Sequence, residues 1–332
     1  MPRPHELRSY RRGAEWAIAA GAALELGIFA ALSEQPTPAD GLAKRLSLHP
    51  RGVRILLGAL EALDLVRSES GVFALTGQGR ARFVDAGTPD YEAAATRQWM
   101  RHIQDWATLL PETVRSGGPP AERIEKRWDQ ASLSRFMSAM AAKPPDTVRA
   151  VADLCMGRLA ETGRAESGWR ALDLGGGPGA FAREFVRRGM EVTLADRPEV
   201  IDHVATAYGL DGVPGLRLWK GDFLSELPEG PFHLVFLANV SHIYDVATNR
   251  TLISRLSARL APGGPLAVLD FTRDASEFAA LFAITMLLNT EGGTTYTRRE
   301  YEAWMAAAGL AGFRHARVDA DRELLSARKP AE

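Results

Sequence analysis

The chain has 332 residues, 46% of them hydrophobic and 24% charged, with a formal net charge of −1. This length allows two domains and a large core. The balanced charge excludes a global field that would attract nucleic acid or anionic lipid, so neither a nucleic acid nor a membrane is expected as a partner. The single cysteine, Cys155, excludes an internal disulfide framework, suits a cytoplasmic location and is expected to be a small buried hydrophobe.

Residues 1–88 predict a small helical domain that ends in a β-hairpin. Apolar spacing indicates helices over Trp16–Leu32 and Ala39–Leu46, a third helix from Val53, and paired strands over 65–67 and 72–75. This order is typical of a winged helix. The expected recognition helix is rich in leucine and alanine with only two arginines near its start, so protein–protein contact is favoured over DNA binding.

No apolar run reaches the ~20 residues of a membrane span. The nearest run, residues 14–31, is interrupted by Glu15 and Glu25 and indicates a buried helix.

Residues 89–165 predict connecting helices, broken at 117–120 and again at 143–145 by glycine and proline. Aromatic and methionine side chains recur here at helical spacing, which usually indicates ordinary core. As a cluster they also suit the wall of an apolar substrate pocket. The members are Trp99, His102, Trp106, Trp128, Leu133, Phe136, Met137 and Met140.

Residues 166–332 predict a doubly wound, Rossmann-like α/β domain. The segment Ala171–Phe181 reads as a strand, a glycine-rich turn and the start of a helix, and the next strand, Glu191–Asp196, ends on an acid. This is the plan of a nucleotide-binding βαβ unit, in which the acid accepts from ribose hydroxyls.

The glycine spacing discriminates between nucleotides. The loop carries Gly175, Gly177 and Gly179, so the third glycine comes one residue too early for a dinucleotide fingerprint. Asp173 precedes the loop, and a carboxylate there repels phosphate but attracts the ammonium and sulfonium groups of S-adenosylmethionine. The pattern therefore favours a methyltransferase that uses S-adenosylmethionine as its cofactor. An NAD(P)-dependent oxidoreductase and a glycine turn without a ligand are the weaker alternatives.

Further candidates follow later strands, at the edge where open parallel sheets bind ligands. Asp222 can accept from an adenine amino group, and Phe223 can pack on the ring. Asn239 and His242 follow the strand expected at 232–237. A histidine at this edge suits a general base.

These motifs resemble the class I S-adenosylmethionine-dependent O-methyltransferases of the plant caffeate and bacterial acetylserotonin-like type, over nearly the whole chain. The resemblance rests on the segments 173–179, 221–223, 239–242, 260–264 and 291–297. It implies an N-terminal winged-helix-like domain that forms a homodimer, and His242 as the general base. It also implies that Phe136 and Met140 clamp a hydrophobic acceptor, and we expect Trp99, Met286 and Asn289 to contact that acceptor as well.

The chain departs from the family pattern around His242. The family often reads His-Asp-Trp where this chain has Ile243 and Tyr244 after the histidine, and Thr295 replaces a carboxylate. Asp270 stands where a glutamate commonly orients the base, and Glu291 is the other candidate for that role. From the resemblance as a whole, we expect O-methylation of an aromatic secondary metabolite. C-methylation, a ligand-binding regulator and a catalytically dead scaffold stay open as alternatives.

Overall fold

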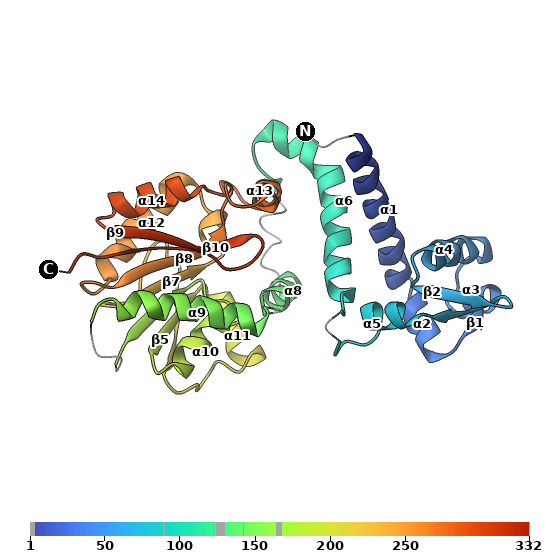
Figure 1. The fold of residues 1–332 in the computed structure, drawn as a ribbon, viewed down its shortest axis with the longest axis horizontal. Coiled ribbons are helices and arrows are strands. Elements are labelled where there is room, and N and C mark those ends of the chain that lie inside the picture. Colours follow the sequence, from blue (N-terminus) through green and yellow to red (C-terminus); the bar gives the residue numbers. More distant parts are fainter. Residues whose placement is uncertain are drawn as a thin grey trace. The chain divides into compact units, whose positions relative to one another are not determined.

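The computed structural model describes residues 4–88, 90–121, 123, 130–141, 143–163 and 168–331. The chain divides into two compact units, Met1–Thr108 and Leu109–Glu332, and the helix α6 (Ala93–Ser116) runs through the boundary between them (Figure 1). The domain boundaries expected at residues 88 and 165 stay predictions.

The first unit is a helical domain with a small sheet. Its helices are α1 (Pro4–Glu25), α2 (Ile28–Glu34), α3 (Ala39–Arg45), α4 (Pro50–Ala62) and α5 (Gly77–Phe83). The strands β2 (Val66–Glu69) and β3 (Val72–Leu75) form the expected hairpin, and β1 (Thr37–Pro38) adds to β3. The core gathers aliphatic side chains around Phe29, whose ring stacks on Phe83 at 4.4 Å.

The single helix expected over Trp16–Leu32 is wrong, because the chain bends by 61° between α1 and α2. Gly27 lies at the break with φ +75°, a backbone conformation that glycine adopts without steric cost. The bend allows Leu24 and Ile28 to enter the same core. Within the described ranges, no single helix is long and apolar enough to cross a membrane, although this bent pair passes such a test when its two helices are taken together.

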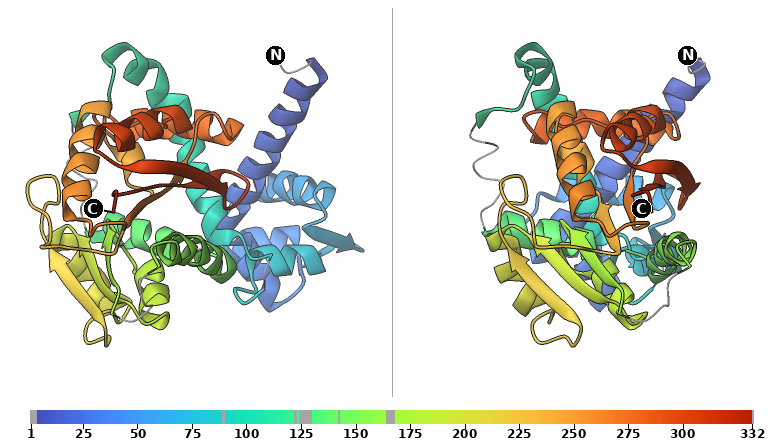
Figure 2. Two further views of the ribbon diagram at one scale, coloured as in Figure 1. Left: turned by 60° about the vertical axis from the view of Figure 1, so that its left-hand side comes forward. Right: turned by 90° about the vertical axis from the view of Figure 1, so that its left-hand side faces the viewer.

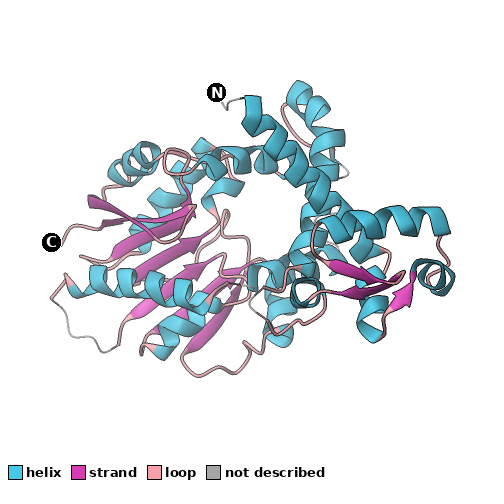
Figure 3. Cartoon of the chain, turned by 45° about the vertical axis from the view of Figure 1, so that its right-hand side comes forward, coloured by secondary structure: helices cyan, strands magenta, loops and turns pink. Residues whose placement is uncertain are grey.

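The second unit is built on a seven-stranded sheet in the order β6-β5-β4-β7-β8-β10-β9. Strands β6 (Leu216–Lys220), β5 (Glu191–Asp196), β4 (Arg170–Leu174), β7 (Leu234–Ala238) and β8 (Pro265–Phe271) are parallel. The final strands, β9 (Ala311–Arg317) and β10 (Arg322–Arg328), pair antiparallel and close the sheet beside β8 (Figure 3).

Helices cover both faces of this sheet (Figure 2). One core packs α9 (Pro145–Ala160), α10 (Ala180–Arg187) and α11 (Pro198–Ala207) against the strands, and Cys155 is fully buried in it, as expected. The other core contains α12 (Val246–Arg259) and α14 (Arg298–Ala307). Along β4, Ala171 faces the first core and Leu172 the second, so side chains alternate as a sheet buried on both faces requires.

Two helices complete the unit: α8 (Gln130–Ala141) and α13 (Glu277–Asn289). The predicted breaks at 117–120 and 143–145 are confirmed, because α6 ends at Ser116 and α8 ends before the two prolines that begin α9. Trp128 lies outside the described residues.

Two glycines of α5 test the packing of the first unit. A Cβ at Gly79 would lie 2.0 Å from the carbonyl oxygen of Leu65, whereas a Cβ at Gly77 would meet nothing within 4 Å. We expect Gly79→Ala to lower the free energy of unfolding by roughly 1–3 kcal/mol, because a backbone atom cannot move aside cheaply. Gly77→Ala is the matched control and should change it by less than ~1 kcal/mol. Denaturant unfolding followed by circular dichroism measures both, and equal effects of the two variants would contradict this packing.

Candidate active site

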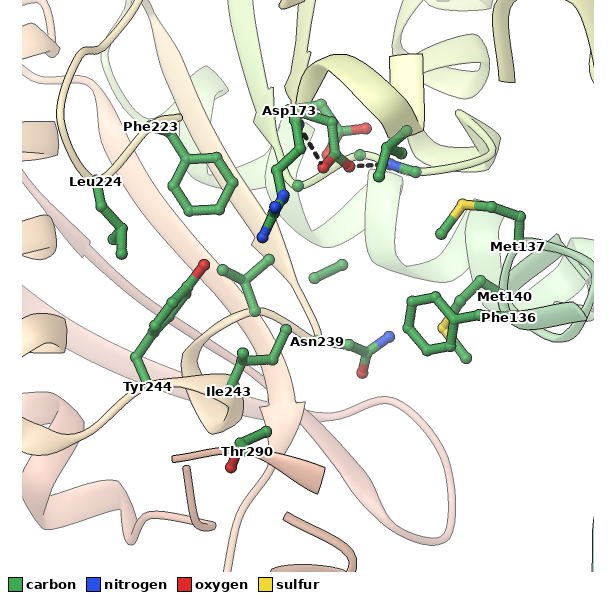
Figure 4. Close-up of a pocket in the computed structure, with 18 of the residues that line it drawn as sticks. Phe136, Met137, Met140, Asp173, Phe223, Leu224, Asn239, Ile243, Tyr244 and Thr290 are labelled. Atoms are coloured by element: carbon green, nitrogen blue, oxygen red, sulfur yellow. Dashed lines mark hydrogen bonds between the residues drawn. The ribbon is translucent and has the colours of Figure 1, made fainter. Parts of the chain in front are cut away.

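A cavity of about 410 Å³ opens at the carboxyl edge of the sheet in the second unit. Its walls come from the glycine loop after β4, the ends of β5 and β7, the helix α8 and the segment 289–292 (Figure 4). This is the edge where parallel α/β sheets bind ligands, and the volume suits a small-molecule site.

The glycine loop shapes the floor of the cavity. Gly175 has φ +69°, and a Cβ there would lie 2.6 Å from Cγ2 of Val240. Gly177 also has a positive φ, but a Cβ there would meet only Sδ of Met137, at 3.7 Å. Gly175 is therefore required by packing, whereas the space above Gly177 is left for a ligand.

Asp173 places an unpaired carboxylate at this floor. The side chain is 1% exposed, and neither carboxylate oxygen accepts a hydrogen bond of good geometry. Burial raises the pKa of Asp173 to about 7, although the Lys143 charge and, more weakly, the nearby backbone amide of Ala182 oppose the shift. A buried acceptor group without a partner is costly, so the site is suited to a ligand that brings a cation.

Asp196 ends β5 beside the loop, as predicted. One of its carboxylate oxygens accepts from the amide of Gly177 at 3.0 Å and the other from the amide of Arg197 at 2.8 Å. Burial raises its pKa to about 6, against these two hydrogen bonds. Each oxygen keeps a lone pair for a further donor, so the carboxylate can still accept from a ligand hydroxyl.

Phe223 lines the cavity, whereas its neighbour Asp222 does not. Phe223 is buried and lines the cavity, with its ring edge-on to Tyr244 at 6.2 Å. Asp222 is exposed and does not line it, because its carboxylate accepts from the Leu224 amide at 3.0 Å and the Ser225 hydroxyl at 3.2 Å. The side chain caps its own turn, and its expected contact with an adenine amino group stays a prediction.

His242 has a carboxylate partner, and it is Asp270. Nδ1 of His242 lies 2.6 Å from Oδ1 of Asp270, whose side chain is fully buried at the end of β8. The other oxygen, Oδ2, accepts from the His242 amide at 3.2 Å and from the Tyr301 hydroxyl at 3.1 Å. Burial and the nearby Asp270 charge raise the pKa of Tyr301, so its proton stays on this hydrogen bond. Glu291 instead lines the cavity.

This geometry sets the chemistry open to the imidazole. A hydrogen bond from Nδ1–H to Asp270 selects the tautomer with a free lone pair on Nε2, the atom that a general base uses. The ring is 7% exposed and does not line the cavity, although the next residues, Ile243 and Tyr244, do. It lies instead against an aromatic cluster of Phe271, Phe278 and Phe282, with Phe282 at 5.1 Å.

The expected acceptor residues divide into two groups. Phe136, Met140 and Asn289 line the cavity, together with Asn239 of the cofactor set. Met286 and Trp99 do not line it. Met286 is buried in α13, and Trp99 belongs to the first unit, where it lines a different cavity with Trp16.

Sequence reasoning missed several residues of the site. Met137 lines the cavity, as its place in the predicted aromatic and methionine cluster allowed, whereas Lys143 was missed because a lysine before two prolines indicates surface. The aromatic cluster was also missed, because α13 is apolar nearly all round and its sequence does not reveal which face is exposed. In the structure the exposed side chains of Phe278, at 45%, and Leu281, at 53%, mark the exposed face of α13.

The comparisons with known proteins agree with this geometry. The chain matches the model of the O-methyltransferase domain over residues 140–314 and that of the O-methyltransferase dimerisation domain over residues 19–85. It is 31% identical to the acetylserotonin O-methyltransferase of Mus musculus, covering 89% of this chain and 80% of that protein. It is 27% identical to the tetracenomycin polyketide synthesis 8-O-methyl transferase TcmO of Streptomyces glaucescens, over 93% and 91%.

The fold also has solved counterparts. The structure of human N-acetylserotonin methyltransferase in complex with SAM matches with a TM-score of 0.77 at 23% identity, covering 98% of this chain and 97% of that one. At this identity the likeness concerns the fold, and it agrees with the predicted α/β domain preceded by a helical one.

The unpaired Asp173 carboxylate yields a prediction on stability. The pKa of Asp173 is about 7 in the folded protein and ~3.9 in an unfolded chain. The protonated carboxyl group therefore contributes to stability fully below pH ~3.9, and this contribution is lost as the pH rises through about 7. We expect Asp173→Asn to be more stable than the wild type at pH 8 in the ligand-free protein, by roughly 1–3 kcal/mol. The gain should fade towards pH 4. Thermal unfolding across this range measures it, and a variant less stable than the wild type at pH 8 would contradict the assignment.

Proposed function

Since the chain belongs to the O-methyltransferase family, we propose that it methylates a hydroxyl group of an aromatic, hydrophobic small molecule, with His242 as the general base. S-adenosylmethionine as methyl donor and O-methyl transfer as the reaction belong to this family, and the sequence predicted both. The observation that carries the finer proposal is the pairing of His242 with the buried Asp270 next to the half-buried rings of Phe271 and Phe282.

The cavity fits the methyl donor. The partnerless carboxylate of Asp173 and the partnerless side-chain oxygen of Asn239 are acceptors that a ligand ammonium satisfies. Asp196 would accept from ribose hydroxyls, and Phe223 would pack against the adenine ring. When bound, the cofactor supplies an electrophilic methyl group on a sulfonium.

The residues of the chain then perform a proton transfer. A phenolic hydroxyl has a pKa of about 10, so little of it is ionised at neutral pH. Nε2 of His242 would accept the hydroxyl proton, and the acceptor oxygen so activated would be the nucleophile for the methyl group that the bound cofactor would supply. Asp270 holds the imidazole in orientation and stabilises the positive charge that develops on it. The transfer is direct, without a covalent intermediate on the protein.

The acceptor is proposed to be flat and apolar. Phe136, Met140 and Met137 form an apolar wall of the cavity. Phe271 and Phe282 lie against His242, and Phe278 packs on both of these rings. Aromatic rings pack on such surfaces with large buried areas. The relative from Streptomyces glaucescens, which is named for tetracenomycin polyketide synthesis, supports an acceptor from secondary metabolism.

A homodimer is proposed to form through the first unit. The match to a dimerisation domain over residues 19–85 supports this assembly. Large apolar side chains of this unit are also exposed, Ile55 at 60% and Leu26 at 42%, and such surface favours a partner. A cytoplasmic location is proposed from the single cysteine.

The role of the base is tested by His242→Ala. We expect turnover on the acceptor to fall by about 10²–10⁴-fold while affinity for S-adenosylhomocysteine is kept, because the imidazole acts on the acceptor proton. The loss should shrink as pH rises towards the pKa of the acceptor, since an ionised acceptor needs no base. Steady-state kinetics and calorimetry measure the two quantities.

His315→Ala is the control, because this histidine is half exposed on β9 and pairs with Glu323 outside the cavity. Turnover of His242→Ala near that of the control at neutral pH would show that His242 is structural. The reaction would then proceed on an acidic acceptor or on a carbon nucleophile.

A further inference from the structure

Among the described residues, four hydrogen-bond donors hold the carboxylate of Asp270. Oδ1 lies 2.6 Å from Nδ1 of His242 and accepts from the Phe271 amide at 2.8 Å. Oδ2 accepts from the His242 amide at 3.2 Å and from the Tyr301 hydroxyl at 3.1 Å. Three of these donors thus belong to the histidine itself or to the next residue of β8. The fourth, Tyr301, holds the carboxylate from α14, a separate element of the second unit.

The Tyr301 side chain is fixed by packing. It is fully buried, and its ring packs edge-on against Trp304 at 5.2 Å and Tyr296 at 6.2 Å. A capping box of Thr297 and Glu300 begins α14 directly before it, so the backbone is held at this point as well. The hydroxyl is therefore presented by a rigid support.

The hydroxyl group of Tyr301 is costly to bury, because a phenylalanine ring would fill the same space without a polar atom. Its hydrogen bond goes to a carboxylate, and such charge-assisted bonds are stronger than bonds between neutral groups. Burial and the Asp270 charge raise the pKa of Tyr301, so the hydroxyl keeps its proton and acts as a donor. Part of the negative charge of Asp270 is thereby stabilised by Tyr301 and not by the imidazole.

Resting on the proposed function, we propose that Tyr301 is a positioning residue for the base. Its hydroxyl anchors Oδ2 of Asp270, which leaves Oδ1 for Nδ1 of His242, and it limits how strongly Asp270 holds a proton on the imidazole. The ring of His242 is then neutral, and able to take a proton from the methyl acceptor, at a lower pH than Asp270 alone would allow. A Tyr301 that merely fills the core would leave the ionisation of His242 unchanged.

Other ionisable groups approach this network from β10, α12 and α14, and each has a partner of its own. None of them is altered when the Tyr301 hydroxyl is removed, so they act equally in the wild type and in a variant without this group. They are Glu323, opposite Asp270 on β10 and paired with Arg298 and His315, the Tyr296 hydroxyl, which donates to the Tyr244 carbonyl, Asp245, which caps α12, and Glu300, which bonds to Thr297.

The test follows the His242 ring by nuclear magnetic resonance on the full chain, with and without S-adenosylhomocysteine. Its signals are assigned from their loss in His242→Ala. In Tyr301→Phe we expect the pH midpoint of the ring titration to rise by about 0.5–1 pH unit, a part of the effect of a hydrogen bond to a charged group. The reason is that removal of the donor leaves more of the Asp270 charge to hold a proton on the imidazole.

Two controls separate this effect from a loss of packing. Tyr296→Phe removes a hydroxyl from the same aromatic group, but one that donates to the Tyr244 carbonyl, and it should leave the midpoint unchanged. In an Asp270→Asn background, Tyr301→Phe should cause no further change, because no carboxylate charge is then left to stabilise.

Equal midpoints in Tyr301→Phe and the wild type would overturn the proposal, and so would the same rise in the Asp270→Asn background. Should Tyr301→Phe fail to fold, the wild type decides, because the ring signals of Tyr301 should then change with the titration of His242. Tyr301 signals that ignore this titration would contradict the proposal.

The titration needs no methyl acceptor, so it is independent of the turnover of His242→Ala. Normal turnover of that variant would overturn His242 as the base in the proposed function. The titration alone decides whether Tyr301 acts on the pair of Asp270 and His242.

Discussion

A buried carboxylate without a partner is the constraint on which the site depends. Asp173 lies in the central strand β4 and its side chain is 1% exposed, so little water reaches its charge. Such a group is kept only if something brings a cation to it, because an unpaired ion in an interior is destabilising. The glycine loop that follows supplies the space for that ligand, above Gly177.

The hydrogen-bond network around Asp270 is complete, whereas the carboxylate of Asp173 has no hydrogen-bond partner. Asp270 is fully buried as well, yet it receives hydrogen bonds from the His242 ring and amide, from the Tyr301 hydroxyl and from the Phe271 amide. The His242 side chain is therefore held in one orientation in the free protein. The carboxylate of Asp173, in contrast, lacks a hydrogen-bond partner in the free protein, so only the Asp270 network is complete without a ligand.

Much of this follows from the sequence, and the exceptions have physical reasons. The strands β4 to β8 were predictable because short apolar runs end in glycine or acidic residues, and these ends meet at one edge. The family, the fold class and the cofactor were predicted for the same reason and are confirmed.

The bend at Gly27 was missed, because an apolar run continues through it. Asp222 lies outside the cavity because its carboxylate accepts hydrogen bonds within its own turn. Lys143 was missed because sequence does not show that a lysine before two prolines is half-buried and lines the cavity.

The central claim is that the Asp173 carboxylate binds a cation of the ligand. It is tested most directly by the number of protons released when the ligand binds. Calorimetry of S-adenosylhomocysteine at about pH 6.5, in buffers of different ionisation enthalpy, counts the protons exchanged. Since the pKa of free Asp173 is about 7 and a bound ammonium lowers it, we predict release of a large fraction of one proton. Lys143 stays protonated at this pH, and Asp196 contributes a minor share. Most of the release should vanish in Asp173→Asn. An equal release from that variant, or proton uptake by the wild type, would contradict the account.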